Sequence, residues 1–157
     1  MRHKKVQKRQ TEPDKVFQSK LAAKFINNLM KDGKKTVAEK LFYQALEEID
    51  KKGQKGIEVF EQAVLNVGPR QEVKAKRIGG ASYQVPMEVR GDRKTSLAIR
   101  WIIEAAKARS SKDYHGFAAK LAAELIDAVN NAGAAVKKRD TAHRMAEANR
   151  AFSHFRF

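Results

Sequence analysis

The sequence contains no cysteine, so it can form neither a disulfide framework nor a thiolate metal site. A reducing compartment is compatible with this composition. No apolar run is long enough to span a bilayer. Residues 1–10 carry five Lys or Arg residues but not the apolar segment of a signal peptide. We therefore expect a soluble, cytoplasmic protein without a membrane partner.

Acidic residues are also scarce, since 18 Asp and Glu stand against 33 Lys and Arg in a chain of 157 residues. The formal net charge of +15 repels itself at low salt, and a polyanion would relieve that repulsion. Hydrophobic residues make up an ordinary 42% of the chain, enough for one domain with a core. We expect a basic, disordered arm at residues 1–10 and a single helical domain at residues 11–157.

Six segments have apolar residues at helical spacing, and we expect each to form a helix. They are residues 20–30, 36–52, 57–67, 95–109 and 117–129, and a basic C-terminal helix with its tail at about 134–157. Thr36 and Glu39 have the spacing of a capping box at the start of the second helix. Gly68-Pro69 predicts a left-handed cap that ends the third helix.

Residues 72–90 predict a β-hairpin, because apolar and polar residues alternate on both sides of Gly79-Gly80. Pro86 fits a two-stranded ribbon, in which both strands are edges. Such a ribbon is barely stable alone in water. We expect it to project from the helical body and to be ordered by an anionic partner. The predicted class is mainly α, a six-helix bundle with one protruding two-stranded antiparallel β-hairpin between helices three and four.

No group of residues predicts catalysis. None of the four histidines has a second ligand at metal-binding spacing. Residues 33–36 are similar to the end of a phosphate-binding loop, but Asn28 stands where the first glycine belongs and a helix precedes the segment. The acidic residues at 47–61 are better explained as a solvated face than as paired acid and base groups. We expect no enzyme activity, metal, cofactor or small-molecule substrate.

The cations fall into five clusters, at the arm, the Lys34-Lys35 turn, the hairpin, the start of the fourth helix and the C-terminal helix. Any single cluster is as well explained by a solubilising surface as by contact with a ligand. Their joint occurrence, away from the acidic residues at 47–61, favours a nucleic acid partner. RNA is the preferred partner, and an architectural DNA-binding protein is the alternative.

Two aromatic residues have two interpretations each. Tyr83, beside Gln84, could stack on an unpaired base, or it could pack the hairpin onto the body. Alternation places Tyr83 on the same face as Val85, which favours packing. Trp101 shares a helical face with apolar residues, so we assign it to the core and treat stacking on a base as the lesser alternative.

Three motifs of this sequence resemble the bacterial small-subunit ribosomal protein seven family. They are the hairpin block at residues 72–89, the segment Ala98-Ile99-Arg100-Trp101, and the basic run from Lys138 to Phe152. The similarity covers nearly the whole chain beyond the arm. The sequence departs from the family at Thr141-Ala142, where an acidic pair before Thr-His is usual, and at Phe157, where a closing tryptophan is usual.

This resemblance implies a six-helix fold with an extended hairpin and direct binding to the head domain of small-subunit rRNA. It also implies an early role in assembling that domain, contacts with other small-subunit ribosomal proteins, and a position at the subunit interface. There the hairpin tip and the C-terminal helix would approach exit-site tRNA and the path of the mRNA.

Charge and resemblance together select the candidate site residues. The residues that we expect to bind rRNA are Arg2, Lys4, Lys5, Lys8, Arg9, Lys34, Lys35, Arg70, Lys74, Lys76, Arg77, Arg90, Arg93, Lys94, Lys137, Lys138 and Arg150. The residues that we expect to face tRNA or mRNA are Gly79, Gly80, Ser82, Tyr83, Gln84, Arg139, His143 and Arg144.

Overall fold

The computed structural model describes residues 11–156, so the five cations of the predicted arm, and Phe157, lie outside the described residues. In chain order the elements are α1 (Lys20–Leu29), α2 (Lys35–Asp50), α3 (Gly56–Val67), β1 (Gln71–Ile78), β2 (Ala81–Glu88), α4 (Gly91–Ala108), α5 (Phe117–Val129), α6 (Gly133–Ala148) and the 3-10 helix η1 (Arg150–Arg156). The predicted mainly α class, with a hairpin between the third and fourth helices, is confirmed.

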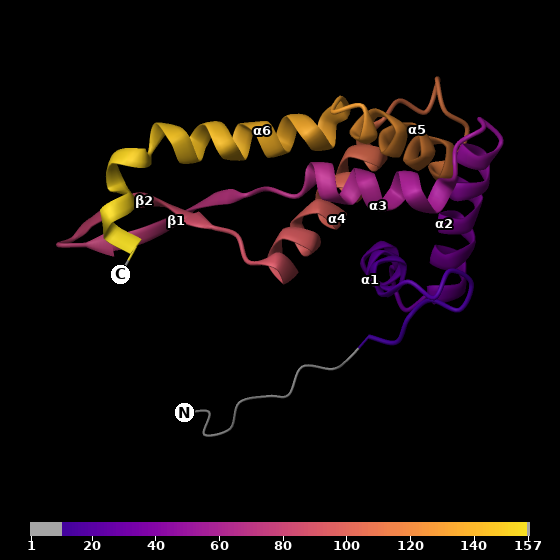
Figure 1. The fold of residues 1–157 in the computed structure, drawn as a ribbon, viewed down its shortest axis with the longest axis horizontal. Helices are drawn as coiled ribbons and strands as arrows, with labels where there is room; N and C mark the ends of the chain where they lie inside the picture. Colours follow the sequence, from indigo (N-terminus) through magenta and orange to yellow (C-terminus); the bar gives the residue numbers. More distant parts are fainter. Residues whose placement is uncertain (1–10, 157) are drawn as a thin grey trace.

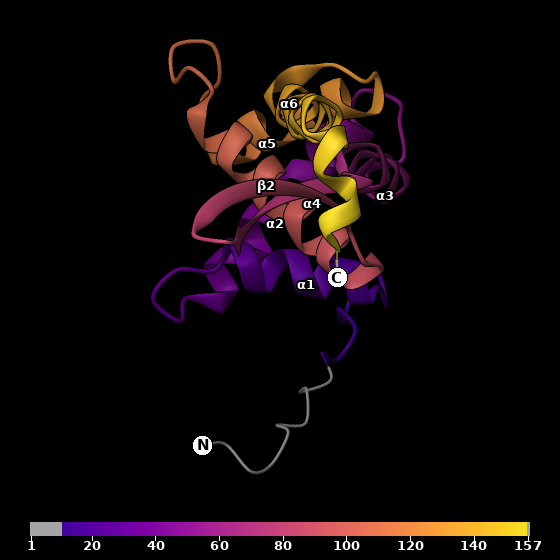
Figure 2. The same ribbon diagram turned by 90° about the vertical axis from the view of Figure 1, so that its left-hand side faces the viewer.

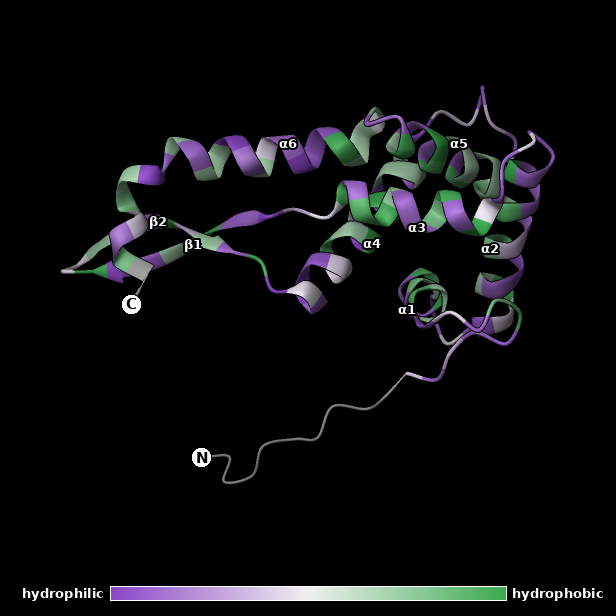
Figure 3. Ribbon diagram, viewed as in Figure 1, coloured by the Kyte–Doolittle hydropathy of each residue, from purple (hydrophilic) through white to green (hydrophobic). Residues whose placement is uncertain are grey.

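The core is formed by the apolar faces of the first five helices, with the start of α6 laid against them. At its centre the rings of Phe25, Phe42 and Phe60, from α1, α2 and α3, lie with centroids 5.1–5.2 Å apart. Pairs of rings at such distances add stabilisation beyond the apolar area that they bury. Hydrophobic colours gather on these inner helices, while hydrophilic colours recur along α6 and the hairpin (Figure 3).

The hairpin and α6 extend side by side away from the core (Figures 1 and 2). After α6 the chain turns into η1, which packs against β2 (Figure 1). Projection of the hairpin is therefore confirmed, while its ordering by an anionic partner stays a prediction. Within the chain itself, α6 and η1 cover the ribbon and bury Val85, which is 1% exposed. We call the hairpin, α6 and η1 together the extended arm.

The predicted caps of two helices are wrong, although α3 ends at Val67 as predicted. Thr36 lies inside α2, which begins at Lys35 directly after a tight turn in which Asp32 and Gly33 both have positive φ. Lys34 occupies the N-cap and makes no side-chain capping bond, because its ammonium group cannot accept a hydrogen bond. Gly68 has φ −63° and ψ 116°, which is extended and not left-handed. The proline that follows it disfavours helical geometry and directs the chain toward β1.

Two large apolar residues of the helices are not fully buried. Val37 of α2 is 52% exposed. Trp101 is half-buried, and it packs against the core from its edge. The assignment of Trp101 to the core thus holds for part of the ring.

Candidate nucleic-acid interface

The hairpin has a regular antiparallel register that runs from Gln71 opposite Glu88 to Ile78 opposite Ala81. Gly79 and Gly80 form its tip with φ of 56° and 88°, a conformation that two glycines adopt without strain and that suits a two-residue hairpin turn. The tip is exposed, as are Ser82 and Gln84. The tip residues thus lie at the far end of the extended arm.

The cations of β1 have different surroundings. Arg77 is exposed and forms no ion pair with a carboxylate of residues 11–156, and exposed Lys74 has a loose ion pair with Glu72 at 3.6 Å. Lys76 is half-buried, and its ammonium group donates to the carbonyl of Phe155 in η1 at 3.0 Å. Lys74 and Arg77 are therefore available to a ligand, whereas Lys76 holds the tail against the hairpin.

A salt bridge ties the hairpin to α4 at its root. The Arg93 guanidinium donates two hydrogen bonds of 2.7 Å to the carboxylate of Glu72. The bond from Arg93 lowers the pKa of Glu72, against the opposing effect of burial. Arg93 was expected to contact phosphate, but this bidentate bond satisfies much of its hydrogen-bonding capacity.

Tyr83 packs against the protein. Its ring lies 5.3 Å from the ring of Phe152 and 5.5 Å from that of Phe155, and it is half-buried. Of the two interpretations of Tyr83, packing is the one that the structure bears out. The sequence did not predict its partners, because they lie about 70 residues further along the chain.

Four predicted site residues meet in one pocket at the root of the extended arm. Arg70 precedes β1, Lys94 lies in the first turn of α4, and Arg139 and His143 stand one helical turn apart on α6. The pocket has a volume of about 430 Å³, and Leu65, Asn66, Gly68 and Asn131 complete its walls. Two residues expected to bind rRNA are thus beside two that were expected to face tRNA.

Two of these residues are held by the protein itself. Arg139 donates to the carbonyl of Asn66 at 2.7 Å and to Asn131 Oδ1 at 3.2 Å, and it also pairs with Asp140. The backbone N–H of Arg70 donates to His143 Nε2 at 2.9 Å. Burial, together with the nearby charges of Arg139, Arg70 and Lys94, lowers the pKa of His143, which favours the neutral ring that can accept this hydrogen bond.

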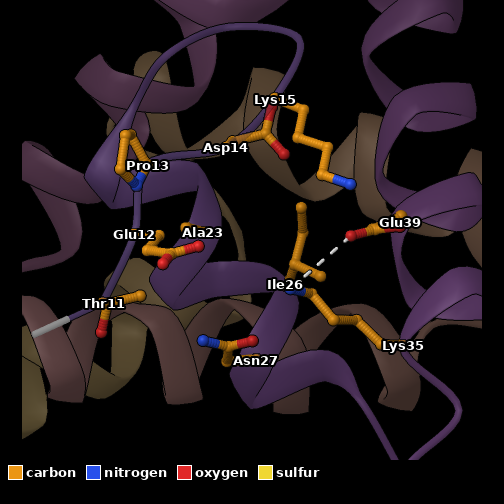
Figure 4. A pocket seen from close by; sticks show the side chains of 10 residues that line it. All are labelled: Thr11, Glu12, Pro13, Asp14, Lys15, Ala23, Ile26, Asn27, Lys35 and Glu39. Carbon is orange, nitrogen blue, oxygen red and sulfur yellow. Dashed lines mark ion pairs between the residues drawn. The ribbon is translucent and has the colours of Figure 1, made fainter. Parts of the chain in front are cut away.

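The remaining described candidates lie apart from this pocket. Lys34, Arg90, Lys137 and Arg144 are exposed and have no carboxylate among residues 11–156 as an ion-pair partner, whereas Lys138 pairs with Glu104 and Arg150 with Glu147. Lys35 lies at the opposite end of the molecule from the hairpin tip and pairs with Glu39 at 3.9 Å. That pair lies beside a pocket of about 400 Å³ between the start of the described chain and α1 (Figure 4).

The comparisons with known proteins identify the family. A family model described as ribosomal protein S7p/S5e matches residues 1–150. The chain belongs to this family of ribosomal proteins. It is 58% identical over 153 residues to small ribosomal subunit protein uS7 of Nitratidesulfovibrio vulgaris (strain DSM 19637 / Miyazaki F), with 97% of this chain and 96% of that protein covered.

Relatives from other bacteria show similar identity. The protein of the same name from Lawsonia intracellularis is 56% identical over 153 residues, covering 97% of this chain and 96% of its own. That from Thioalkalivibrio sulfidiphilus is 57% identical over 150 residues, covering 96% and 95%. The resemblance to the protein seven family is therefore confirmed, and this family of structural ribosomal proteins agrees with the expectation of no enzyme activity.

Two further findings concern the described residues. Within residues 11–156 no three His, Cys, Asp or Glu side chains are grouped so that they could hold a metal ion. No helix in this part of the chain is both long and apolar enough to cross a membrane.

Sequence reasoning missed the residues that hold the site together in this family member. Asn66 donates to the carbonyls of Ala128 and Val129 at 3.2 and 3.0 Å, which joins the end of α3 to the end of α5. Phe152 and Phe155 hold the hairpin. The aromatic spacing of the tail was a signal for the two phenylalanines, but a single Asn at a helix end gives no such signal.

Proposed function

We propose that this protein is a non-catalytic, RNA-binding constituent of the small ribosomal subunit that helps to fold the head domain of the rRNA. Its cations neutralise phosphates of several RNA segments at once. Because the core fixes the distances between the cation clusters, binding selects one relative placement of those segments. Side chains cannot read the narrow major groove of A-form RNA, so specificity comes from backbone shape, junctions and unpaired bases.

One observation carries the proposal: the extended arm of this ribosomal-family chain bears exposed cations without carboxylate partners among residues 11–156. They are Arg77 at the hairpin, Arg90 at its root, and Lys137 and Arg144 on α6. A cation that is paired with a carboxylate of its own chain must break that ion pair before it binds phosphate. These four cations have no such pair to break. The names of the relatives support the small subunit as the place of this binding.

Filter binding with transcripts of small-subunit rRNA tests the proposal. The purified protein should bind a transcript of the head domain in magnesium buffer more tightly than a transcript of equal length from another domain. Duplex DNA at equal phosphate concentration should fail to displace the head transcript, since DNA lacks the 2′-hydroxyl and the junction geometry. Equal affinity for the two transcripts, or displacement by DNA, would contradict the proposal.

We further propose that the hairpin tip faces exit-site tRNA and the mRNA path, away from the rRNA contacts of the core. The tip is exposed and lies farthest from the helices of the core (Figure 1). Gly79 and Gly80 present backbone groups there without side chains. This geometry supports contact with a neighbouring RNA by the tip.

Deletion of residues 78–82 separates the two activities. The shortened protein should bind the head transcript as wild type does, because the core and the root are unchanged. Ribosomes that carry the shortened protein should retain deacylated tRNA at the exit site less well. The amount of tRNA that is held on a filter together with the ribosomes measures this retention. The replacement of both glycines by alanine is the milder companion variant. Loss of head-transcript binding by the deletion would show that the tip binds rRNA.

A further inference from the structure

The pocket at the root of the extended arm has the composition of an anion site. Eight residues line it: Leu65, Asn66, Gly68, Arg70, Lys94, Asn131, Arg139 and His143. Three are cations, two are amides, and none is a carboxylate. We propose that this pocket binds one phosphodiester group of the RNA backbone, with Arg70 and Lys94 as its principal ligands. This inference rests on the proposed function and assigns one phosphate contact to a defined place.

Other pockets of the described residues differ from this one in chemistry. The pocket in Figure 4 includes Glu12, Asp14 and Glu39, whose charges would repel a phosphate. The pocket between α1, α2, α4 and α5 has lysines at its edge but is walled by apolar side chains such as Leu41 and Phe117. The root pocket combines positive charge with polar walls, as phosphate recognition requires.

Arg70 and Lys94 form no ion pair with a carboxylate of residues 11–156, so their charges need no release before binding. Arg139 adds positive charge, but its guanidinium is already bonded to Asn66, Asn131 and Asp140. It therefore forms a fixed wall of the pocket, while the other two cations can turn toward a ligand. Asp140 is the carboxylate that offsets part of the charge of Arg139.

The backbone positions both ligands. The N–H of Arg70 donates to the neutral His143 ring, which fixes the chain where β1 begins. A Cβ atom built on Gly68 would lie 2.6 Å from Cε and 2.8 Å from Cγ of Lys94, so the lysine chain lies directly over the glycine. The missing side chain of Gly68 thus leaves the space in which Lys94 reaches the pocket. This makes Gly68 a positioning residue.

Gly68 allows a test that leaves every charge in place. Its φ of −63° suits alanine, so Gly68→Ala should fold, but its methyl group must push the Lys94 chain aside. Lys94→Ala removes the ammonium group itself, and Lys94→Arg retains the charge. Lys52→Ala, at an exposed lysine in the turn after α2, is the matched control. Circular dichroism and thermal unfolding verify that each variant is folded.

Binding to the head-domain transcript is the first measurement. Lys94→Ala and Gly68→Ala should each weaken it about tenfold, the order expected for a lost hydrogen bond to a charged group. Lys94→Arg should restore most of the affinity, and Lys52→Ala should match wild type. If wild type binds tightly but neither pocket variant weakens binding, the pocket inference is wrong and the proposed function stands.

Inorganic phosphate is the second probe, and it distinguishes the two possible sources of the group. In NMR spectra of the full chain at constant ionic strength, phosphate should shift the Arg70 amide and the His143 ring saturably. Lys94→Ala should abolish the shift. Suppose that phosphate shifts these signals saturably but that neither Lys94→Ala nor Gly68→Ala weakens binding to the transcript. The pocket would then be a site for free phosphate, and the RNA assignment would be overturned. If wild type fails to bind the transcript, the proposed function fails, and this titration still decides whether the pocket binds an anion.

Discussion

Glu124 is a buried carboxylate, 1% exposed, on which the junction of α4, α5 and α6 depends. One of its oxygens accepts from Arg109 Nε at 2.8 Å, and the other accepts from the backbone N–H of Ala135 at 2.9 Å. Arg109 also binds Asp127 and lies over the ring of Tyr114. A buried ion pair is costly to break because it leaves an uncompensated charge. These bonds fix where α6, and with it the extended arm, leaves the core.

Gly133→Ala should destabilise this junction. The residue has φ +89°, and a Cβ atom there would lie 2.9 Å from Glu124 Oε1. We expect a loss of about 1–3 kcal/mol in the free energy of unfolding, the cost of holding a non-glycine residue in such a conformation. Urea unfolding measures it. Gly91→Ala is the control, since Gly91 has open space around it and begins α4; an equal loss in both variants would contradict the argument.

The buried carboxylate of Asp14 should make the free energy of unfolding depend on pH. It is 6% exposed, accepts from the Tyr43 hydroxyl at 2.6 Å, and accepts from the backbone N–H groups of Val16 and Phe17 at 3.1 Å. Burial alone would raise the pKa of Asp14, but these hydrogen bonds hold it below the ordinary value of 3.8. Because the folded pKa is the lower one, the stabilisation is complete above the ordinary value and is lost as pH falls below it.

The comparison of wild type with Asp14→Asn measures this effect. At pH 7 the variant should be less stable by about 1.5–3 kcal/mol, the range for hydrogen bonds to a charged group. The difference should shrink as the pH falls below about 4, because the unfolded wild-type chain then binds a proton at Asp14 more readily than the folded protein does. Urea unfolding at several pH values gives the curve. A difference that stays constant from pH 7 to pH 3 would show that ionised Asp14 contributes nothing.

Among the elements, the hairpin depends most on a partner from elsewhere in the chain. A two-stranded ribbon is barely stable alone, and here η1 supplies the rings of Phe152 and Phe155 against Tyr83. Lys76 adds a hydrogen bond to the backbone of η1. The tail after α6 is thus a structural support of the extended arm.

Replacement of both Phe152 and Phe155 by alanine should loosen the hairpin and leave the core folded. Each aromatic pair contributes about 0.5–1.5 kcal/mol beyond its buried area, so amide hydrogen exchange in β1 and β2 should become at least tenfold faster. Exchange in α3 and α5 should not change. Phe17→Ala is the control, because its ring pairs with Tyr43 at the other end of the molecule. Unchanged protection of the strands would mean that α6 alone holds them.

At the scale of the whole molecule, the charges are unevenly distributed. Cations without a carboxylate partner among residues 11–156 lie along the extended arm and at its root, whereas Glu47 and Glu48 lie at a pocket near the far end of α2. Such a distribution orients the protein toward a polyanion by one side. The salt dependence of RNA binding should therefore depend much more on the cations of the extended arm than on the cations beside the acidic residues.

Lys74→Ala combined with Arg77→Ala tests this expectation. The slope of log affinity against log salt concentration should flatten by roughly 0.7 to 0.9 for each lost phosphate contact. Lys76 is left in place because it supports the tail. The control pair is Lys51→Ala with Lys52→Ala, two exposed lysines at the end of α2. Filter binding of the head transcript from 50 to 300 mM salt gives the slopes, and equal slopes for the two double variants would refute a distinct RNA-facing side.

Sequence patterns predicted the elements well because helical and strand periodicities are local. The buried residues of α1, for example, follow the spacing of Ala22, Phe25, Ile26 and Leu29. The N-cap of α2 and the left-handed conformation of Gly68 were predicted wrongly, since there the adjoining turn and the proline decide the geometry. Of the candidate site, the sequence predicted the cations but not their partners.

The sequence by itself determined the order of the elements from α1 to α6, the excess of positive charge and the family, but not η1 as a separate helix. Only the tertiary structure decided which cations are available. Arg93 is bonded to a carboxylate 21 positions away, Lys138 to one 34 positions away, and Lys76 to a carbonyl 79 positions away. An ion pair or hydrogen bond depends on separation in space, which no local pattern specifies. The root pocket exists for the same reason, because folding alone brings Arg70 and Lys94 beside α6.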